Sequence, residues 1–284
     1  MKMVKLKDKK IWKSNKNNNT IVKCKNVNFG EGYFTVIAGP CAIENKEMAL
    51  QTAKKVENLG ASVFRSSLFK PRTSPYSFQG IGEEGLEILK EIKSETNLLI
   101  ESEVLSAEHL NILYDHIDIV RIGSRNMDNY ELLKEVGKID KPIILKRGMS
   151  ATLKEFLLAA EYIISAGNEH IILCERGIRS FETYTRNTLD ILAVPSLKEL
   201  THLPVIVDPS HSTGKSSLVP SASKAAIAAG ADGLIIEVHP NPKDALSDGE
   251  QSIDFITFEK LMKEIKVLAD VLMKKTSFKQ EVSI

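Results

Sequence analysis

Short runs of apolar and β-branched residues alternate along this chain with longer stretches in which apolar positions recur at helical spacing. Eight such runs predict β-strands, because each is almost continuously apolar and is bounded by turn-forming residues. The predicted strands cover residues 34–38, 62–65, 98–101, 117–122, 142–146, 170–174, 204–208 and 233–238. The stretches between and after them predict helices over residues 46–59, 83–95, 106–114, 128–136, 151–166, 184–193, 217–229 and 254–274.

This alternation indicates an α/β fold in which helices cover a parallel sheet. Eight strand–helix units close naturally into a (β/α)8 barrel of the TIM type, and we expect a single domain with a short N-terminal extension. An open doubly wound sheet is the alternative, but no G-x-G-x-x-G sequence follows the first strand. Because the carboxyl ends of all barrel strands open on one face, residues far apart in sequence converge on one pocket there. The first hypothesis is therefore an enzyme.

Composition narrows the class of protein further. The chain has 284 residues, of which 43% are hydrophobic, and this suits one large barrel. Its 38 Lys and Arg against 37 Asp and Glu show no bias toward a nucleic acid or a membrane surface. No run of apolar residues is long enough for a membrane span or resembles the core of a signal peptide, so we expect a cytoplasmic protein. The three cysteines include no C-x-x-C pair and predict no disulfide framework.

The N-terminal segment differs in composition from the rest of the chain. Residues 1–25 contain nine Lys and only Asp8 as an acid, and they show no useful periodicity. We therefore expect residues 1–30 to be a basic extension that is mobile or lies on the surface, and that is dispensable or serves subunit contacts. The barrel is expected over residues 31–276, followed by a tail over 277–284.

Four residues after predicted strands have side chains suited to binding a metal ion. They are Cys41, His211, Glu237 and Asp248. One thiolate, one imidazole and two carboxylates suit a borderline divalent ion, with room for water or substrate. Each residue alone also has an ordinary explanation, such as a core cysteine or a solvated carboxylate. Their shared position at strand ends is what favours a metal site.

Cationic residues also gather at the strand ends, and they predict an anionic substrate. Six are Arg65, Lys70, Arg72, Arg125, Lys146 and Arg176. Arg and Lys bind phosphate and carboxylate groups, and neighbouring acids such as Glu101, Glu103 and Glu175 are the alternative partners. Thr73 and Ser74 add hydroxyls beside Arg72, in a loop able to wrap a phosphate. The string STGKSS is not a P-loop, because Pro209 stands where that motif requires Gly.

Seven segments together resemble one enzyme family. They are IAGPCAIEN, FKPRTSPYSFQG, RIGSRN, ILKRGM, ILCERGIRSFE, VDPSHSTG and IIEVHPNPKDALSDGEQS. Over residues 28–272 the chain resembles the 3-deoxy-D-arabino-heptulosonate 7-phosphate (DAHP) synthases of the shikimate pathway, type Iβ. The resemblance implies a metal-dependent transferase that condenses phosphoenolpyruvate with erythrose 4-phosphate and water, giving DAHP and phosphate for aromatic amino acid biosynthesis.

Two other functions stay open beside this one. The related octulosonate synthases act on arabinose 5-phosphate and carry a K-x-N-R-S-S-like loop where this chain has KPRTS, so the resemblance favours erythrose 4-phosphate. The second alternative is an inert barrel that acts as a scaffold, for example for a separate chorismate mutase, and the intact ligand and cation sets disfavour it.

The resemblance also implies a role for each candidate site residue. Cys41, His211, Glu237 and Asp248 would hold a divalent metal such as Mn, Fe, Co or Zn, with Cys41 and His211 counted among the catalytic groups. Arg125 and Arg176 would clamp the enolpyruvate phosphate, with Arg65, Lys70 and Lys146 around its carboxylate and bridging oxygen. Arg72, Thr73 and Ser74 would grip the erythrose phosphate, and Lys146 and Glu101 are the candidates for proton transfer.

The chain also departs from the family in ways that affect expectations. Ser66 and Ser67 stand where many relatives have Gly-Gly, which changes the expected shape of the pocket.

Relatives are commonly dimers or tetramers, so we expect a homodimer or homotetramer, with a separate chorismate mutase as a partner to consider. The first 30 residues are too few for a sensing domain, so we expect no feedback inhibition by aromatic amino acids acting on this chain alone.

Overall fold

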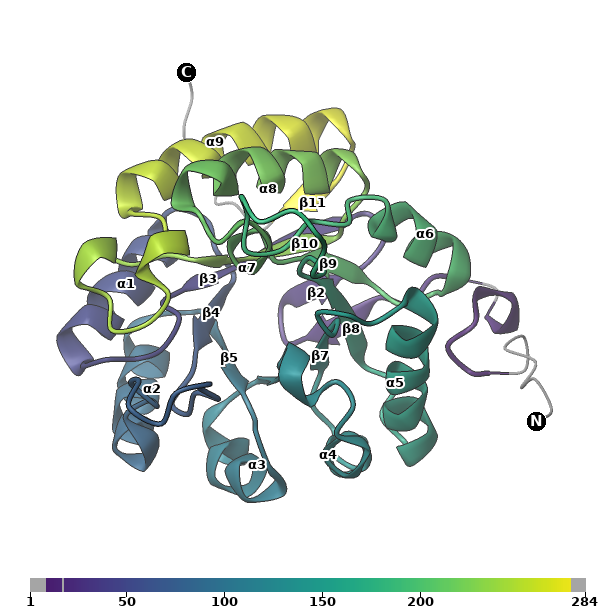
Figure 1. Cartoon of the computed structure of the whole chain (residues 1–284), viewed down its shortest axis with the longest axis horizontal. Helices are drawn as coiled ribbons and strands as arrows, with labels where there is room; N and C mark the ends of the chain where they lie inside the picture. The colour runs from purple at the N-terminus through teal and green to yellow at the C-terminus, as the bar shows by residue number, and fades with distance from the viewer. Residues whose placement is uncertain (1–8, 17, 277–284) are drawn as a thin grey trace.

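A computed structural model describes residues 9–16 and 18–276 and shows a closed parallel barrel surrounded by helices (Figure 1). The barrel strands are β3 (Tyr33–Gly39), β4 (Val63–Ser66), β5 (Leu99–Glu103), β6 (Ile119–Ile122), β7 (Ile143–Lys146), β8 (Ile171–Glu175), β9 (Val205–Val207) and β10 (Gly233–Glu237). Each pairs in parallel with the next, and β10 pairs with β3 to close the ring. The predicted (β/α)8 fold is confirmed.

Helices follow the strands and cover the outside of the barrel (Figure 1). They are α1 (Lys46–Asn58), α2 (Gly85–Glu95), α3 (Ala107–Leu113), α4 (Tyr130–Val136), α5 (Leu153–Ala166), α6 (Ala193–Leu200), α7 (Pro209–Thr213), α8 (Val219–Ala228) and α9 (Phe255–Val271). A short strand, β11 (Lys275–Thr276), pairs with the start of β3. Within the described part of the chain, no helix is long and apolar enough to span a membrane.

The interior of the barrel is a packed apolar layer. It receives one buried aliphatic side chain from each strand: Ile37, Val63, Leu99, Ile119, Ile144, Ile172, Ile206 and Ile235. A larger apolar layer lies between the strands and the helices. Since the strands are buried on both faces, their residues are continuously apolar until the carboxyl ends, where polar side chains begin.

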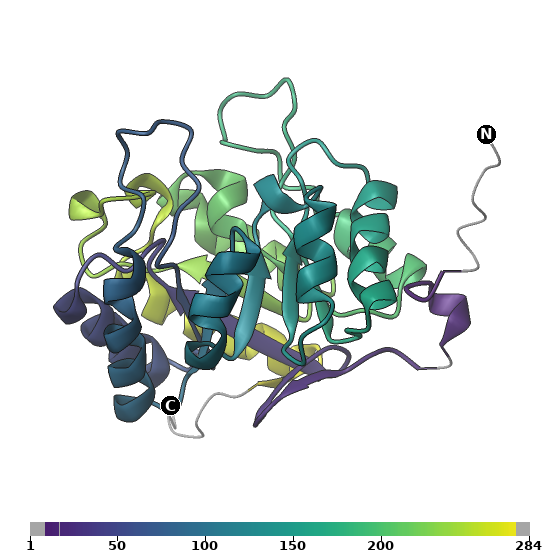
Figure 2. The same cartoon turned by 90° about the horizontal axis from the view of Figure 1, so that it is seen from below.

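A β-hairpin closes the other end of the barrel. Strands β1 (Val22–Cys24) and β2 (Val27–Phe29) pair antiparallel, and their buried side chains join the apolar layer of the barrel interior. Figure 2 shows the hairpin on the side opposite the long loops that follow β4 and β8. Lys25 Nζ in the hairpin turn lies 2.8 Å from Asp118 Oδ1 and ties the turn to the barrel.

The expectation of an arm without regular structure is therefore wrong for residues 22–29, and the hairpin is integral to the core. Strands of three residues are too short to show a periodicity in the sequence. Ile11, nearer the N-terminus than the hairpin, is also fully buried. The division at residue 30 stays a prediction, and the tail expected over 277–284 lies outside the described residues.

The helix predicted over residues 184–193 is also wrong. The helix after β8 is α6, which begins at Ala193, and the preceding residues form a long loop with a bridge between Ile178 and Thr188. Pro195 lies in the first turn of α6, where a missing N–H does no harm, so it marks the beginning of a helix. The apolar spacing of Leu189 and Ile191 comes from loop residues that pack against the core.

Replacing Phe29 tests the role of the hairpin. Phe29 is fully buried, so we expect Phe29→Ala to lower the free energy of unfolding by about 3–5 kcal/mol. Lys23, exposed on the same hairpin, provides the control, and Lys23→Ala should change stability by less than about 0.5 kcal/mol. Urea unfolding followed by circular dichroism measures both, and equal stability of the two variants would show that the hairpin is not part of the core.

Candidate active site

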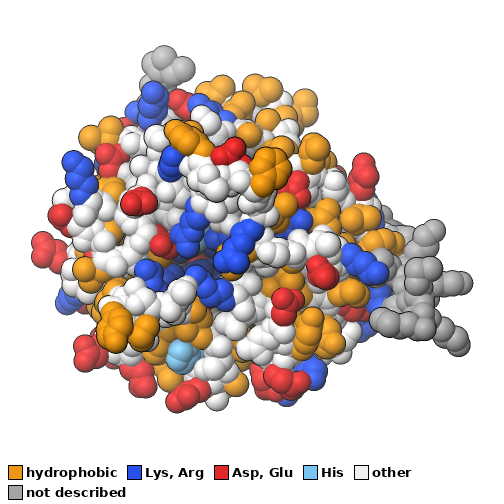
Figure 3. All heavy atoms as spheres, in the orientation of Figure 1, with side chains coloured by type: hydrophobic (Ala, Val, Ile, Leu, Met, Phe, Trp, Pro, Cys, Tyr) orange, Lys and Arg blue, Asp and Glu red, His pale blue; other side chains and the backbone are white. Residues whose placement is uncertain are grey.

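A cavity of about 270 Å³ opens at the carboxyl ends of the strands, and cationic side chains dominate its wall. The space-filling view shows Lys and Arg side chains around a hollow in the middle of this face (Figure 3). Seven of the lining residues are cationic: Lys70, Arg72, Arg121, Arg125, Lys146, Arg176 and Arg186. Only Glu103 and Asp248 among the lining residues carry carboxylates. The cavity therefore has a strong excess of positive charge and suits a multiply anionic ligand.

The structure brings the proposed metal ligands together at one side of this cavity. Cys41 Sγ and carboxylate oxygens of Glu237 and Asp248 all lie within 4.8 Å of one another. Gly39, with φ of 155°, lets the chain turn directly from β3 toward Cys41, since a Cβ there would lie 2.4 Å from the Arg65 carbonyl oxygen. One sulfur and two oxygens at these distances fit a borderline divalent ion.

His211, on the short helix α7, lies beside this group of three. Its Nε2 lies 3.5 Å from Glu237 Oε1 and 3.7 Å from Asp248 Oδ2. Asp208 caps the helix, accepting a hydrogen bond from the His211 backbone N–H at 2.8 Å, while its Oδ2 lies 2.8 Å from His211 Nδ1. The Nδ1 edge of the ring thus lies beside Asp208 without a hydrogen bond, and Nε2 faces the carboxylates. Burial lowers the pKa of His211 to about 4, so the ring is neutral at neutral pH and able to act as a ligand.

The remaining ligands also have fixed orientations. Gln251 donates a hydrogen bond from Nε2 to Glu237 Oε2 at 2.6 Å, and Arg65 Nη2 lies 3.0 Å from Glu237 Oε1. Cys41 donates its S–H to Asp248 Oδ2 at 3.3 Å. Burial raises the pKa of the Cys41 thiol to about 12, so binding as a thiolate requires a nearby cation and releases a proton.

Arg65 and Arg176 carry buried donors that have no hydrogen-bond partner. Both are almost completely buried, and they leave Arg65 Nε and Nη1 and Arg176 Nε and Nη1 unpaired. Burial lowers the pKa of Arg176. Unpaired buried donors are costly, and an anionic ligand is the partner that would satisfy them.

Lys146 lies at the end of β7 and forms an ion pair with Asp208 Oδ2. It lines the cavity although it is almost completely buried, and this burial lowers its pKa. A lowered pKa brings an ammonium group closer to the range in which it donates a proton readily.

Glu101 occupies a different place from the one its predicted role suggests. It does not line the cavity, and its Oε1 accepts a hydrogen bond from Arg121 Nε. Arg121 also donates to Glu103 Oε2 at 3.0 Å and to Ser67 Oγ at 2.8 Å. Of the two acids, Glu103 is the one that faces the cavity, and it lies 3.8 Å from Lys70 Nζ. A role of Glu101 in proton transfer stays a prediction.

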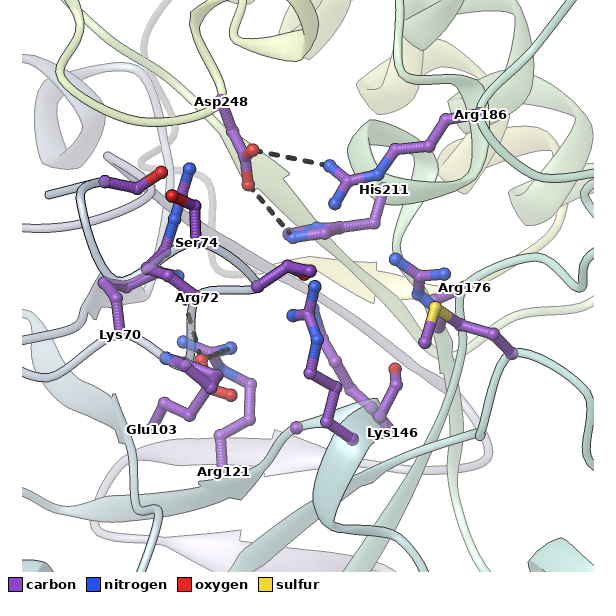
Figure 4. A pocket seen from close by; sticks show the side chains of 17 residues that line it. Lys70, Arg72, Ser74, Glu103, Arg121, Lys146, Arg176, Arg186, His211 and Asp248 are labelled. Carbon is purple, nitrogen blue, oxygen red and sulfur yellow. Dashed lines mark hydrogen bonds and ion pairs between the residues drawn. The ribbon is translucent and has the colours of Figure 1, made fainter. Parts of the chain in front are cut away.

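The loop after β4 carries the predicted phosphate grip. Arg72, Thr73 and Ser74 all line the cavity and are at least partly exposed, as is Arg125 in the short 3-10 helix Ser124–Asn126. The base of the loop is closed by backbone hydrogen bonds from Lys70 to Gln79 and from Gly82 to Leu68. The loop rises above the barrel in the view of Figure 2, and Figure 4 shows Arg72 and Ser74 among the side chains that line the cavity.

Several site residues were not identified from the sequence. Arg121 lies on β6 and Asp208 directly follows β9. Their position at strand ends was a signal for the site, although no role was assigned to either residue. The Asp208-Pro209 pair was in addition a signal for the beginning of a helix. Arg186 gave no such signal, because it lies in the middle of a long loop and reaches the cavity only through the fold.

Comparison with known proteins agrees with this geometry. The family model described as the DAHP synthetase I family matches residues 11–271. The chain belongs to this family. Its similarity to the phospho-2-dehydro-3-deoxyheptonate aldolase of Thermotoga maritima is 53% identity over 253 residues, which covers 89% of this chain and 75% of that protein. The 2-dehydro-3-deoxyphosphooctonate aldolase of Geobacter sulfurreducens is 31% identical over 265 residues, covering 86% of this chain and 95% of that protein.

Solved structures of DAHP synthases have the same fold. A crystal structure of the Thermotoga maritima DAHP synthase superimposes with a TM-score of 0.92 at 50% identity, covering 94% of this chain and 78% of that one. A truncated form of the Thermotoga enzyme gives a TM-score of 0.88 at 47% identity, covering 93% and 97%. The resemblance to DAHP synthases inferred from the sequence motifs is therefore confirmed.

The buried network around Arg121 predicts a pH dependence of stability. Burial alone would raise the pKa of Glu103, but Arg121 and Lys70 outweigh it and lower the pKa from 4.5 to about 2. Because the pKa is lowered in the folded state, the ionised Glu103 carboxylate stabilises the folded protein. This stabilisation is fully present above about pH 4.5 and is lost as the pH falls toward 2. We expect Glu103→Gln to destabilise the protein by about 3 kcal/mol at pH 7, and by progressively less as the pH falls below 4.5.

Urea unfolding at a series of pH values between 7 and 3 measures this difference. Glu108 on α3 is exposed, so Glu108→Gln serves as the control and should differ from the unmodified protein by less than about 0.5 kcal/mol at every pH. A destabilisation by Glu103→Gln that stays constant with pH would show that the carboxylate charge is not what stabilises the network.

Proposed function

We propose that this chain catalyses the condensation of phosphoenolpyruvate with erythrose 4-phosphate and water to give DAHP and phosphate, the first step of the shikimate pathway. The observation that carries the proposal is the cavity at the carboxyl ends of the strands, which seven cationic side chains and only two carboxylates line. One of those carboxylates, Asp248, belongs to the cluster with Cys41, His211 and Glu237. Membership of the DAHP synthetase I family and 53% identity to a heptonate aldolase support it.

The positive charge of the cavity addresses the main physical difficulty of this reaction. Both substrates carry phosphate groups, and one also carries a carboxylate, so they repel each other as they approach. Cationic side chains fixed around the cavity remove this repulsion and hold the reacting carbons in line. In the reaction, carbon 3 of the enol bonds to the aldehyde carbon, water oxygen bonds to carbon 2, and phosphate leaves.

The arrangement of the cations suggests which substrate group each one binds. Arg176, with two unpaired buried donors, and Arg125, which also lines the cavity, are suited to the enolpyruvate phosphate. Lys70 and Lys146 line the cavity, are almost completely buried and suit its carboxylate and bridging oxygen. Arg65 is assigned to the same groups, although it is fully buried beside Glu237 and does not line the cavity. Arg72, Thr73 and Ser74 lie on the raised loop after β4, where a second phosphate would enter.

Lys146 is the better placed of the two candidates for proton transfer. It faces the cavity, and its pKa is lowered by burial, whereas Glu101 lies behind Arg121. Asp208 holds both Lys146 and His211, so one carboxylate orients a proton donor and a metal ligand together. This coupling supports a shared reaction centre at the ends of β7 and β9.

The donor set also supports dependence on a divalent metal. Cys41, His211, Glu237 and Asp248 would hold the ion, and His211 is kept neutral and correctly oriented for this role. When bound there, a divalent ion supplies Lewis-acid chemistry, for an aldehyde oxygen or for water. Mn, Fe, Co and Zn all accept this mixture of donors.

Octulosonate synthesis from arabinose 5-phosphate is the second candidate function. The relatives with that name are 31–33% identical to this chain, against 53% for the heptonate aldolase. The KPRTS loop, with Arg72, Thr73 and Ser74 at the cavity, favours erythrose 4-phosphate. Phosphate release assayed with each aldose phosphate distinguishes the two activities and an inert barrel.

We propose a cytoplasmic homodimer or homotetramer, and a separate chorismate mutase as the partner to test first.

Removal of the metal ligands tests the metal requirement. We expect chelation to abolish phosphate release and Cys41→Ser to lower it by orders of magnitude, because a neutral hydroxyl is a poor ligand for such ions. Cys24, in the hairpin at the opposite end of the barrel, provides the control, and Cys24→Ser should keep full activity. Full turnover after exhaustive chelation would contradict the metal requirement, and near-normal activity of Cys41→Ser would make Cys41 a core residue only.

Replacement of Arg72 tests the assignment of the acceptor phosphate. Losing one charge-assisted contact should lower kcat/KM for erythrose 4-phosphate by roughly ten- to a hundredfold, about 1.5–3 kcal/mol, in Arg72→Ala. The apparent affinity for phosphoenolpyruvate should stay nearly unchanged. Arg179→Ala, at an exposed arginine outside the cavity wall, serves as the control. Equal weakening of both substrates would place Arg72 elsewhere in the site.

A further inference from the structure

We propose that Arg186 and Asn187, in the loop between β8 and α6, are positioning residues that hold the candidate metal ligands in place. The two residues are called the 186–187 clamp below. They contact the elements that carry His211, Glu237 and Asp248, although neither belongs to a strand end. This inference rests on the proposed function, because it concerns the same metal site, and it adds two residues for which the sequence indicated no metal-related role.

Asn187 and the backbone of the clamp fix the helix that carries His211. Asn187 Nδ2 donates a hydrogen bond to the His211 carbonyl oxygen at 2.8 Å. The backbone N–H of Asn187 donates to the Ser212 carbonyl oxygen at 2.9 Å, and the backbone N–H of Arg186 donates to the Thr213 carbonyl oxygen at 3.1 Å. Three consecutive carbonyls of α7 are thus bound by two consecutive loop residues. Helix α7 has only five residues, so it depends on such external contacts for its position.

The Arg186 side chain contacts Asp248 directly and is linked to Glu237 through Gln251. Its Nη1 donates to Gln251 Oε1 at 2.7 Å. The same nitrogen lies 3.4 Å from Asp248 Oδ1, as the dashed line in Figure 4 shows. Gln251 is almost completely buried and donates from Nε2 to Glu237 Oε2 at 2.6 Å. Because Arg186 occupies the Gln251 oxygen, the amide nitrogen must face Glu237. Arg186 therefore sets the orientation of the group that orients Glu237, while it holds the outer oxygen of Asp248 directly.

Close packing fixes the backbone of the clamp and the Asn187 side chain, while the Arg186 side chain is 38% exposed. Gly214 ends α7 with φ of 65°, and a Cβ at this position would lie 2.4 Å from Arg186 Cβ. Asn187 is only 4% exposed, and a Cβ on Gly177 would lie 2.9 Å from its Cβ. The loop and helix α7 therefore approach at backbone contact distance. Preorganised ligands of this kind bind a metal more tightly than mobile ones.

Charge and positioning make opposite predictions for loss of Arg186, so the experiment separates them. A guanidinium beside Asp248 repels a bound cation, and removing it should by charge alone tighten metal binding. If Arg186 acts by positioning, its removal should weaken binding instead. Groups that orient metal ligands typically contribute roughly 10- to 100-fold in affinity.

The test is titration of Co²⁺ into the metal-free full-length chain, with the dissociation constant and the thiolate-to-cobalt absorption band as readouts. We expect Arg186→Met to weaken Co²⁺ binding roughly 10- to 100-fold and to alter the band, and Arg186→Lys, which keeps a donor, to weaken it less. Gln251→Met should resemble Arg186→Met. The double variant should lose little more than either single one, because both changes release the same carboxylate.

Arg179→Met provides the matched control, since Arg179 lies exposed in the same loop, and it should bind Co²⁺ normally. Unchanged or tighter binding in Arg186→Met, or additive losses in the double variant, would overturn the proposal. If Arg186→Met fails to fold, the Lys and Gln251 variants carry the same test. Cys41→Ser distinguishes failure of the metal site from failure of the clamp. If Cys41→Ser binds Co²⁺ as tightly as the unmodified chain, the proposed metal site is wrong. If Cys41→Ser loses Co²⁺ affinity and Arg186→Met does not, only the role of the clamp is refuted.

Discussion

The parallel pairing of β10 with β3 closes the sheet into a ring, and the remaining structure depends on this closure. It places Glu237 opposite Gly39 and so brings the last strand beside the turn that carries Cys41. Two proposed metal ligands separated by almost the whole barrel sequence become neighbours through one strand pairing. An open sheet would leave them at opposite edges, and no site with this composition would form.

Closure also divides the molecule into two ends with different physical tasks. At one end, the β1–β2 hairpin covers a layer of aliphatic side chains, one from each strand. At the other end the strands finish in charged residues, which gain partners from neighbouring strands and loops. Stability and chemistry are thus separated along the barrel axis, so the hairpin can be integral to the core without contacting the cavity.

Buried charges at the second end are tolerated because most of them are paired. Arg121 binds Glu101 and Glu103, Lys146 binds Asp208, and Arg65 binds Glu237. Removing one member would leave the other buried and uncompensated, which is strongly destabilising. Donors of Arg65 and Arg176 stay unpaired within the described residues, and such buried donors are unusual in folded proteins.

The sequence by itself determined the barrel, the strand ends at which chemistry is concentrated, and the motifs that indicate a DAHP synthase. It could do so because buried parallel strands are continuously apolar, and because Cys41, Lys146 and Glu237 lie where that pattern stops. Only the tertiary structure decided what lies between these points. The hairpin strands are too short to show an alternation of apolar and polar residues. In the long loop after β8, apolar residues that pack on the core happen to have the spacing of a helix. The contacts of Arg186 with Asp248 and Gln251 span more than 60 positions of sequence. Such contacts depend on how loops fold over a finished barrel, and local patterns of apolar and polar residues do not encode that arrangement.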